Sequence, residues 1–426
     1  MSNSQFPRLT HSASWLIAVL LFLLGFAGAV PAGGTNWGDW VPAGLLPPLP
    51  ASGPALCVGG FLKPEQGRQV LAAALKTFPD RVSWDAYANH VRERIQQGAG
   101  LSPWPRRTPL HPILRNRRVY DGYSVENIAL ETVPGFWATG NLYRPLATNA
   151  SFPVILATHG HMKSGQGRLE EYMQHRCGTL ARMGAVVFAI DMFGHGETLA
   201  QLGTNTHPHP FSMTIQTWDN IRAIDFLLAL SGADPKRVGV TGESGGGTQS
   251  FLLTALDSRV TLSVPVVMVS SYFFGGCLCE SGYPIHRSAD HFVNNAMIAA
   301  LAAPRPMLLV SDGQDWTQHV PECEYPFLQK IYGYFGAAQN VRNVHLPLEA
   351  HDNGPSKRAA MYRFVAEHFG LNLNAVLGSH GEIDESKITI EPLDALRVFN
   401  ETNLRPASAV GDAAAVEGSL RKLQGR

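Results

Sequence analysis

The chain has no excess of charge of either sign. Its 426 residues include 34 Lys and Arg and 34 Asp and Glu, so the formal net charge is zero. Neither a basic run nor an alternation of basic and aromatic residues occurs along it. Proteins that bind nucleic acids use clustered positive charge to neutralise phosphates. The composition therefore argues against a nucleic-acid partner.

Long apolar runs are also scarce. The run at residues 15–26 is shorter than the roughly 20 residues with which a helix spans a bilayer. Arg8 precedes this run, and small residues follow it up to Ala32. This arrangement predicts a secretory signal peptide over residues 1–32, cleaved near Ala29 or Ala32. We expect a secreted or periplasmic protein with no stable membrane insertion after cleavage; the alternative is an uncleaved membrane anchor.

Cysteine is the third scarce feature. An exported protein meets oxidising conditions, and five cysteines leave at least one unpaired. Cys277 and Cys279 are expected to be too close in sequence to bridge each other easily, so Cys57, Cys177 or Cys323 would be their partners. Five free thiols are the alternative, and the sequence leaves the pairing open.

What the chain does contain is a G-x-S-x-G pentapeptide at residues 242–246. A β-branched run at 238–241 precedes it, and a segment that can begin a helix follows at 247–253. Strand, tight turn and helix form the context of a nucleophile elbow. Such a turn holds its serine at strained backbone angles, and glycines on either side relieve the crowding. We therefore predict that Ser244 is a catalytic nucleophile.

A base and an acid follow in the expected order. His351 lies in the loop after the last predicted strand, residues 341–346, where an imidazole can exchange the serine proton. Asp315 follows the buried run at 306–310 by a short turn, as the acid that orients such a histidine does. Asp312 and Glu280 are alternative acids.

Backbone N–H groups are expected to form the oxyanion hole. One belongs to Gly245, after the nucleophile, and the other to His161, in the loop after the predicted strand at 152–158. A zinc site is conceivable, but its spacing matches no metal signature; it would use His159, His161, His207 and His209. We expect no metal and no cofactor.

Apolar strands alternate with helical segments, which predicts an α/β fold: a mostly parallel, twisted sheet with helices on both faces. The expected divisions are an N-terminal arm and helical extension at 33–114, a catalytic domain at 115–370, and a partly disordered C-terminal appendage at 371–426. A helical hairpin is predicted between Pro64 and Gln97, and a strand-like run occurs at 388–390.

Several motifs together resemble the α/β-hydrolase superfamily, and within it the secreted acetyl xylan esterase and dienelactone-hydrolase-like branch. They are His159-Gly160-His161, the segments 191–196, 242–247 and 313–317, and Glu349-Ala350-His351-Asp352. The resemblance implies that Ser244, His351 and Asp315 are nucleophile, base and acid, with Gly245 and His161 as oxyanion donors. Dienelactone hydrolases use a cysteine nucleophile, so the serine argues against that activity.

The predicted function is a secreted serine carboxylic-ester hydrolase that forms an acyl-enzyme. The resemblance alone implies acetylated carbohydrate or another short-acyl ester as the small-molecule or carbohydrate substrate. The alternatives are a glucuronoyl methylesterase, which would suit Glu280 as acid, and a serine peptidase similar to prolyl oligopeptidases, although the chain lacks room for their propeller. The last alternative is a noncatalytic binding module on a hydrolase-like fold.

Overall fold

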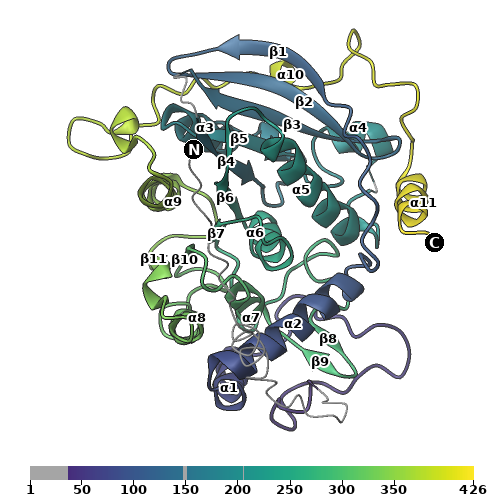
Figure 1. The fold of residues 1–426 in the computed structure, drawn as a ribbon, viewed down its shortest axis with the longest axis vertical. Coiled ribbons are helices and arrows are strands. Elements are labelled where there is room, and N and C mark those ends of the chain that lie inside the picture. The colour runs from purple at the N-terminus through teal and green to yellow at the C-terminus, as the bar shows by residue number, and fades with distance from the viewer. Residues whose placement is uncertain (1–36, 147–150, 205) are drawn as a thin grey trace, which may run out of the picture. The chain divides into compact units, whose positions relative to one another are not determined.

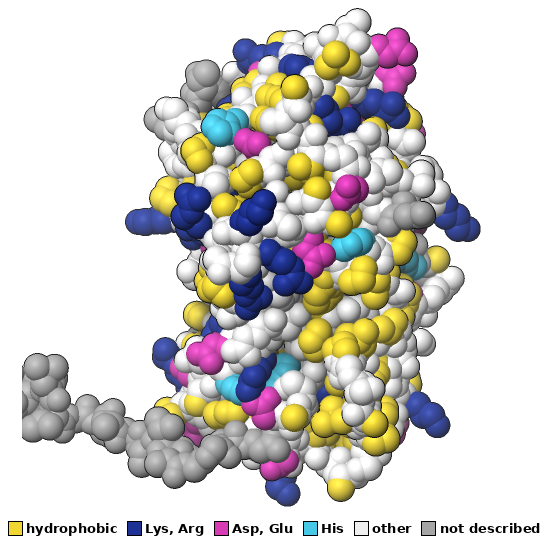
Figure 2. Space-filling model, turned by 90° about the vertical axis from the view of Figure 1, so that its right-hand side faces the viewer, with side chains coloured by type: hydrophobic (Ala, Val, Ile, Leu, Met, Phe, Trp, Pro, Cys, Tyr) yellow, Lys and Arg dark blue, Asp and Glu magenta, His cyan; other side chains and the backbone are white. Residues whose placement is uncertain are grey.

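The computed structural model describes residues 37–146, 151–204 and 206–426. The signal peptide predicted over residues 1–32 lies outside the described residues. Within them, no helix combines the length and apolar character that crossing a membrane requires. On the face drawn in Figure 2, basic and acidic side chains are scattered among apolar and neutral ones.

A nine-stranded sheet forms the centre of the fold, in the order β1-β2-β3-β5-β4-β6-β7-β10-β11 (Figure 1). Neighbouring strands are antiparallel from β1 to β5 and parallel from β5 to β11. The strands are β1 (Ile113–Val119), β2 (Tyr123–Val133), β3 (Phe136–Pro145), β4 (Phe152–Ala157), β5 (Val186–Ile190), β6 (Ala233–Glu243), β7 (Leu262–Val266), β10 (Met307–Asp312) and β11 (Val341–Leu346).

Helices cover both faces of this sheet. On one face lie α3 (Glu171–Arg182) and α9 (Pro355–Phe369); on the other lie α5 (Ser212–Leu228), α6 (Gly245–Leu256), α7 (Asn295–Ala300) and α8 (Glu324–Gly333). Because both faces are covered, every residue of β5, β7 and β10 is buried, and apolar residues make up all of β5 and most of β7 and β10 instead of alternating with polar ones. The predicted fold class is confirmed.

The helical hairpin predicted near the N-terminus is present as α1 (Pro64–Thr77) and α2 (Arg81–Gly98). Asp80 begins α2, because its carboxylate accepts the Ser83 N–H at 2.9 Å. The apolar face of α2 is buried, and the Tyr87 hydroxyl donates 2.6 Å to the Phe292 carbonyl in the hairpin of β8 (Arg287–Ser288) and β9 (His291–Phe292). The extension therefore packs onto the region that follows β7.

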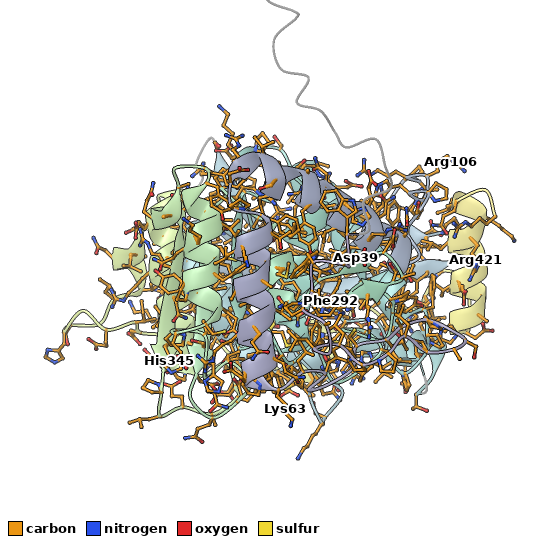
Figure 3. The ribbon with its side chains drawn as sticks, turned by 90° about the horizontal axis from the view of Figure 1, so that it is seen from below. Asp39, Lys63, Arg106, Phe292, His345 and Arg421 are labelled. Carbon is orange, nitrogen blue, oxygen red and sulfur yellow. A yellow bond between two sulfur atoms is a disulfide. The ribbon has the colours of Figure 1, made fainter. Side chains whose placement is uncertain are left out.

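The C-terminal segment contains η3 (Leu373–Val376), α10 (Leu393–Leu396) and α11 (Ala413–Leu423). Seen from below, Arg421 of α11 and His345 of β11 lie at opposite sides (Figure 3). The strand-like run at 388–390 forms no strand, which corrects the expectation. Ile388 packs onto α3, and the Thr389 N–H donates to the Tyr123 hydroxyl at 3.0 Å. A side chain thus takes the backbone hydrogen bond that a neighbouring strand would have taken. The division at residues 33–114, 115–370 and 371–426 stays a prediction.

Candidate active site

Ser244 lies at the junction of β6 and α6, and its backbone is in an unusual conformation. Its φ is 52° and its ψ is −122°, a combination that residues with a Cβ rarely adopt. The turn is tied at both ends: Ser244 N–H donates 3.0 Å to Val266 O, and Ser244 O accepts 3.0 Å from Thr248 N–H. The tight turn holds the half-buried serine at the carboxyl edge of the sheet.

The two outer glycines of the pentapeptide allow this turn. A methyl group on Gly242 would lie 2.6 Å from Gly246 O, inside van der Waals contact. One on Gly246 would lie 2.9 Å from the backbone carbonyl carbon of His159. Because both neighbours are backbone atoms, a side chain at either position has no room without moving the turn or the loop after β4.

The loop after β4 passes directly over the elbow. A methyl group on Gly160 would lie 3.1 Å from Ser244 Cβ, and one on Gly245 would lie 2.7 Å from His161 Cε1. The N–H groups of His161 and Gly245 have no hydrogen-bond partner in the described part of the chain. Two unpaired backbone donors therefore border the serine, as an oxyanion hole requires.

His351 and Asp315 are in direct contact. His351 Nδ1 lies 2.6 Å from Asp315 Oδ2, and the Asp315 side chain is only 3% exposed. The second carboxylate oxygen, Oδ1, accepts from the Thr317 N–H at 2.5 Å and the Thr317 hydroxyl at 2.6 Å. The Trp316 ring lies 4.5 Å from the imidazole, centroid to centroid. These contacts set the orientation of the carboxylate and of the histidine ring.

Ser244 and His351 line the same cavity, whose volume is about 570 Å³. No hydrogen bond joins the two side chains among the described residues. Such contacts are often long in unliganded enzymes and tighten once substrate is bound. The residues that line the cavity are His161, Met162, Lys163, Tyr172, Glu243, Ser244, His351, Asp352, Asn353, Gly354 and Arg358.

Neither alternative acid touches His351 by a hydrogen bond in the described residues. Asp312 is fully buried beside Lys357, with Nζ 3.3 Å from Oδ2, and burial followed by the nearby Asp315 charge raises its pKa. Glu280 is also buried and accepts the Gly276 N–H at 2.7 Å. Burial raises the pKa of Glu280 to about 7. Asp312 and Glu280 therefore interact with groups other than His351.

Glu243 is a residue of this site that sequence reasoning missed. Its buried carboxylate accepts from Gly160 N–H at 2.6 Å and from the Asn353 amide at 3.0 Å, so it joins the loops that carry His161 and His351. Arg176 Nη1 lies 2.6 Å from Oε2. Burial raises the pKa of Glu243, but Arg176 and the other donors outweigh it, so the net shift is downward. An acid inside a buried apolar strand, directly before the serine, was the available signal.

The cysteine prediction needs correction. Cys277 and Cys279 are bonded to each other, whereas Cys57, Cys177 and Cys323 are free. The Cα atoms of the pair are 5.5 Å apart, inside the usual range for a disulfide, because the chain turns here: Glu280 N–H donates 3.2 Å to Cys277 O. Sequence separation alone was therefore a poor guide to the distance between the sulfurs.

Histidines gather beside these cysteines. His161 Nε2 lies 3.0 Å from His207 Nε2 and 3.1 Å from Cys279 Sγ. Burial, and then the neighbouring His207, lowers the pKa of His161 to about 4, so its ring is neutral near pH 7. His159 is occupied elsewhere, since its Nε2 accepts the Met192 N–H at 2.9 Å. Of the four histidines that the sequence offered as a zinc site, His161 and His207 lie together, whereas His159 and His209 bond to other groups.

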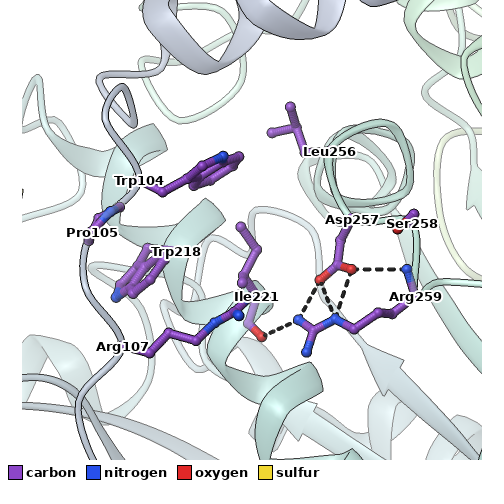
Figure 4. A pocket seen from close by; sticks show the side chains of 9 residues that line it. All are labelled: Trp104, Pro105, Arg107, Trp218, Ile221, Leu256, Asp257, Ser258 and Arg259. Atoms are coloured by element: carbon purple, nitrogen blue, oxygen red, sulfur yellow. Dashed lines mark hydrogen bonds and ion pairs between the residues drawn. The ribbon is translucent and has the colours of Figure 1, made fainter.

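A larger cavity, of about 630 Å³, lies away from Ser244 (Figure 4). Arg259 and Asp257 form an ion pair at its edge, with Nη2 2.6 Å from Oδ2. Ser258 is the single hydroxyl side chain that lines this cavity, and no histidine or carboxylate is hydrogen-bonded to it among the described residues. It is lined by Trp104, Pro105, Arg107, Trp218, Ile221, Leu256, Asp257, Ser258 and Arg259. Ser244, His351 and His161 line the smaller cavity instead.

Comparison with known proteins places the chain among hydrolases. No family model matches the chain. The solved structure of Methylesterase BT1017 is 41% identical, with a TM-score of 0.78, over 85% of this chain and 81% of that one. "Putative hydrolase YtaP" of Bacillus subtilis (strain 168) is 26% identical over 245 residues, 52% of this chain and 80% of that protein.

A third comparison concerns the fold alone. A crystal structure from Bacteroides fragilis NCTC 9343, described as a putative acetyl xylan esterase, is 16% identical, with a TM-score of 0.51. The match covers 75% of this chain and 92% of that one. At this identity the similarity supports the arrangement of strands and helices and says nothing about the substrate of this chain.

Proposed function

Because the chain belongs to the α/β-hydrolase superfamily and is a carboxylic ester hydrolase, we propose that it cleaves its ester through an acyl-enzyme on Ser244. One observation carries this proposal. Ser244 lies at a strained elbow in the same cavity as His351, and His351 Nδ1 is 2.6 Å from the buried Asp315 carboxylate. A nucleophile, a base and an orienting acid are the parts that acyl transfer needs.

The reaction uses these parts in two half-steps. His351 Nε2 takes the hydroxyl proton as Ser244 Oγ attacks the ester carbonyl, and then protonates the departing alcohol. Asp315 accepts the Nδ1–H, which keeps Nε2 free as base and stabilises the imidazolium. The N–H groups of Gly245 and His161 bind the oxyanion. Water repeats the sequence on the acyl-enzyme and releases the acid.

We propose a sugar acid methyl ester as the substrate, with methanol as the leaving alcohol. The relative at 41% identity is named a methylesterase, and a volume of about 570 Å³ lies within the range of small-molecule sites. Lys163 at the rim is exposed and has no ionic partner among the described residues, whereas Arg358 is paired with Glu385. A free carboxylate on a neighbouring sugar would form an ion pair with the Lys163 ammonium group. Acetylated carbohydrate, the sequence-based prediction, is the competing substrate.

Export of the protein is part of the proposal. The signal peptide predicted over residues 1–32 would deliver the enzyme to the periplasm or the medium, where polysaccharides are accessible. Mass spectrometry of the protein made by an exporting bacterial host tests this. A mature N-terminus near residue 30 or 33 is expected; an intact N-terminus refutes cleavage.

A fluorophosphonate probe tests the nucleophile. The full chain should be labelled on Ser244, and Ser244→Ala should lose both labelling and ester hydrolysis. Ser258→Ala, at an exposed serine in the other cavity, is the matched control and should keep both. Equal labelling of wild type and Ser244→Ala would refute the serine mechanism.

A substrate panel tests the ester. Values of kcat/KM for glucuronate methyl ester, p-nitrophenyl acetate, acetylated xylan and a proline peptide should rank the methyl ester first. Lys163→Ala should raise KM for oligomers that carry free carboxylates and leave KM for the single methyl-ester sugar unchanged. Preference for acetylated xylan would favour the competing substrate, and cleavage of the peptide alone would refute an esterase.

A further inference from the structure

Four side chains with metal-binding atoms converge beside the active-site cavity. His161 follows β4, His207 lies between α4 (Glu197–Leu202) and α5, and Cys277 and Cys279 follow β7. The four ligand atoms all lie within 4.8 Å of one another. We propose that these four side chains bind one Zn²⁺ ion when the two cysteines are reduced.

The distances suit a tetrahedral ion. Zinc bonds of roughly 2.0–2.3 Å to nitrogen and sulfur place neighbouring ligand atoms roughly 3.3–3.8 Å apart. His161 Nε2 is 3.0 Å from His207 Nε2 and 3.1 Å from each sulfur, and His207 Nε2 is 3.6 Å from Cys277 Sγ. The nitrogen–nitrogen and nitrogen–sulfur distances need changes of only a few tenths of an ångström, and the two sulfurs move apart once their bond is reduced.

The surroundings of both histidines favour the nitrogen that faces the cluster as a ligand. His207 Nδ1 lies 2.6 Å from Phe193 O, so Nδ1 carries the proton and Nε2 presents its lone pair. His161 Nδ1 lies 4.0 Å from the buried Glu280 carboxylate, on the side away from the sulfurs. Protein zinc sites use the arrangement seen at His207, in which a carbonyl orients the ligating imidazole through its other ring nitrogen.

The ligand set decides which ion fits. Two thiolates and two imidazoles arranged tetrahedrally select zinc among common divalent ions, while Ca²⁺ and Mg²⁺ prefer oxygen. With four protein ligands the site has no open position for water, so it resembles structural zinc sites rather than catalytic ones. The ion would join three loops at the active-site rim, including the loop that carries the His161 N–H. This role does not depend on the proposed ester chemistry.

The disulfide and the metal exclude each other, because disulfide sulfurs carry no thiolate charge. Reduction transfers two electrons. With a phosphine as reductant, disulfide, phosphine and one water give two thiols and the phosphine oxide, so the water oxygen ends on phosphorus. Zn²⁺ then displaces both thiol protons and forms two zinc–sulfur bonds. Oxidising and reducing conditions thus select different states of one loop.

Zinc binding by the full chain tests the proposal directly. Phosphine-reduced wild type, given one equivalent of Zn²⁺, should retain one zinc per chain by native mass spectrometry, and the unreduced chain should retain none. Cys277→Ser with Cys279→Ser, and His207→Ala, should each lose the ion. Cys323→Ser and His380→Ala, which change a free cysteine and an exposed histidine elsewhere, should keep it.

A second measurement needs only the wild-type fold. Zinc should slow iodoacetamide alkylation of Cys277 and Cys279 at least about tenfold, because a bound thiolate is a poor nucleophile, and leave Cys323 unchanged. Co²⁺ should give the visible bands of tetrahedral thiolate coordination. Equal zinc content in wild type and the double serine variant, or unchanged alkylation rates with zinc, would refute the site.

Discussion

Replacing Asp315 with asparagine should abolish most activity by changing which nitrogen of His351 carries the proton. Asp315 Oδ1 already accepts two hydrogen bonds from Thr317, so the asparagine oxygen will take that position. Its amide nitrogen then replaces Oδ2 and donates to His351 Nδ1. The ring must carry its proton on Nε2, which can no longer accept the proton of Ser244.

The structure sets the size of this effect. A histidine held in the wrong tautomer costs about 10⁴ in kcat in serine hydrolases. The His351 side chain is 31% exposed and has room to turn away from the amide, so we expect a loss of about 10³–10⁴, equivalent to about 4–5.5 kcal/mol in activation free energy. Asp315 does not line the cavity, so KM should change little.

Steady-state kinetics on the methyl ester and on p-nitrophenyl acetate measure both quantities. Asp312→Asn is the matched control: it changes a buried aspartate at the end of β10, three residues before Asp315, and leaves the contact between Asp315 and His351 in place. Glu280→Gln tests the third carboxylate. If Asp315→Asn kept kcat within tenfold of wild type while Glu280→Gln lost it, Asp315 would not be the residue that orients His351.

Three further predictions concern buried charges. Glu243→Gln should lower kcat at least about tenfold with little change in KM, and an unchanged kcat would contradict a positioning role for Glu243. The same variant should lower the free energy of unfolding in urea by about 3–5 kcal/mol, because the buried Arg176 charge loses its partner. Lys357→Met should cost about 3–5 kcal/mol, because the side chain is fully buried and Asp312 is left unpaired; a stability within 1 kcal/mol of wild type would contradict this. Burial raises the pKa of Asp219 to about 8, so from about pH 4 to 8 the unfolded chain releases a proton that the folded chain keeps. Wild-type stability should therefore fall relative to Asp219→Asn as pH rises, by at most about 1.4 kcal/mol per pH unit, and a gap independent of pH would refute it.

Local patterns in the sequence were sufficient to predict the parallel sheet and the tight turn at Ser244. Apolar runs alternating with helical segments predict parallel strands covered on both faces, and β5, β7 and β10 are buried throughout. The turn at Ser244 needs glycine at positions 242 and 246, where a methyl group would meet backbone atoms. Both features depend on neighbours in the chain, so they can be recognised without a fold. The run at 388–390 shows the limit, since β propensity cannot supply a partner strand.

Contacts between distant loops were decided only by tertiary structure. The sequence favoured Asp315 as the acid but left Asp312 and Glu280 open. In the structure Asp315 is the one of the three that lies against His351, whereas Asp312 pairs with Lys357 and Glu280 accepts the Gly276 N–H. The cluster at His161 joins residues 46 and 118 positions apart, a spacing that no local pattern encodes. Sequence periodicity and turn chemistry determine each segment, whereas the partners of a buried charge or thiol depend on which loops meet at the edge of the sheet.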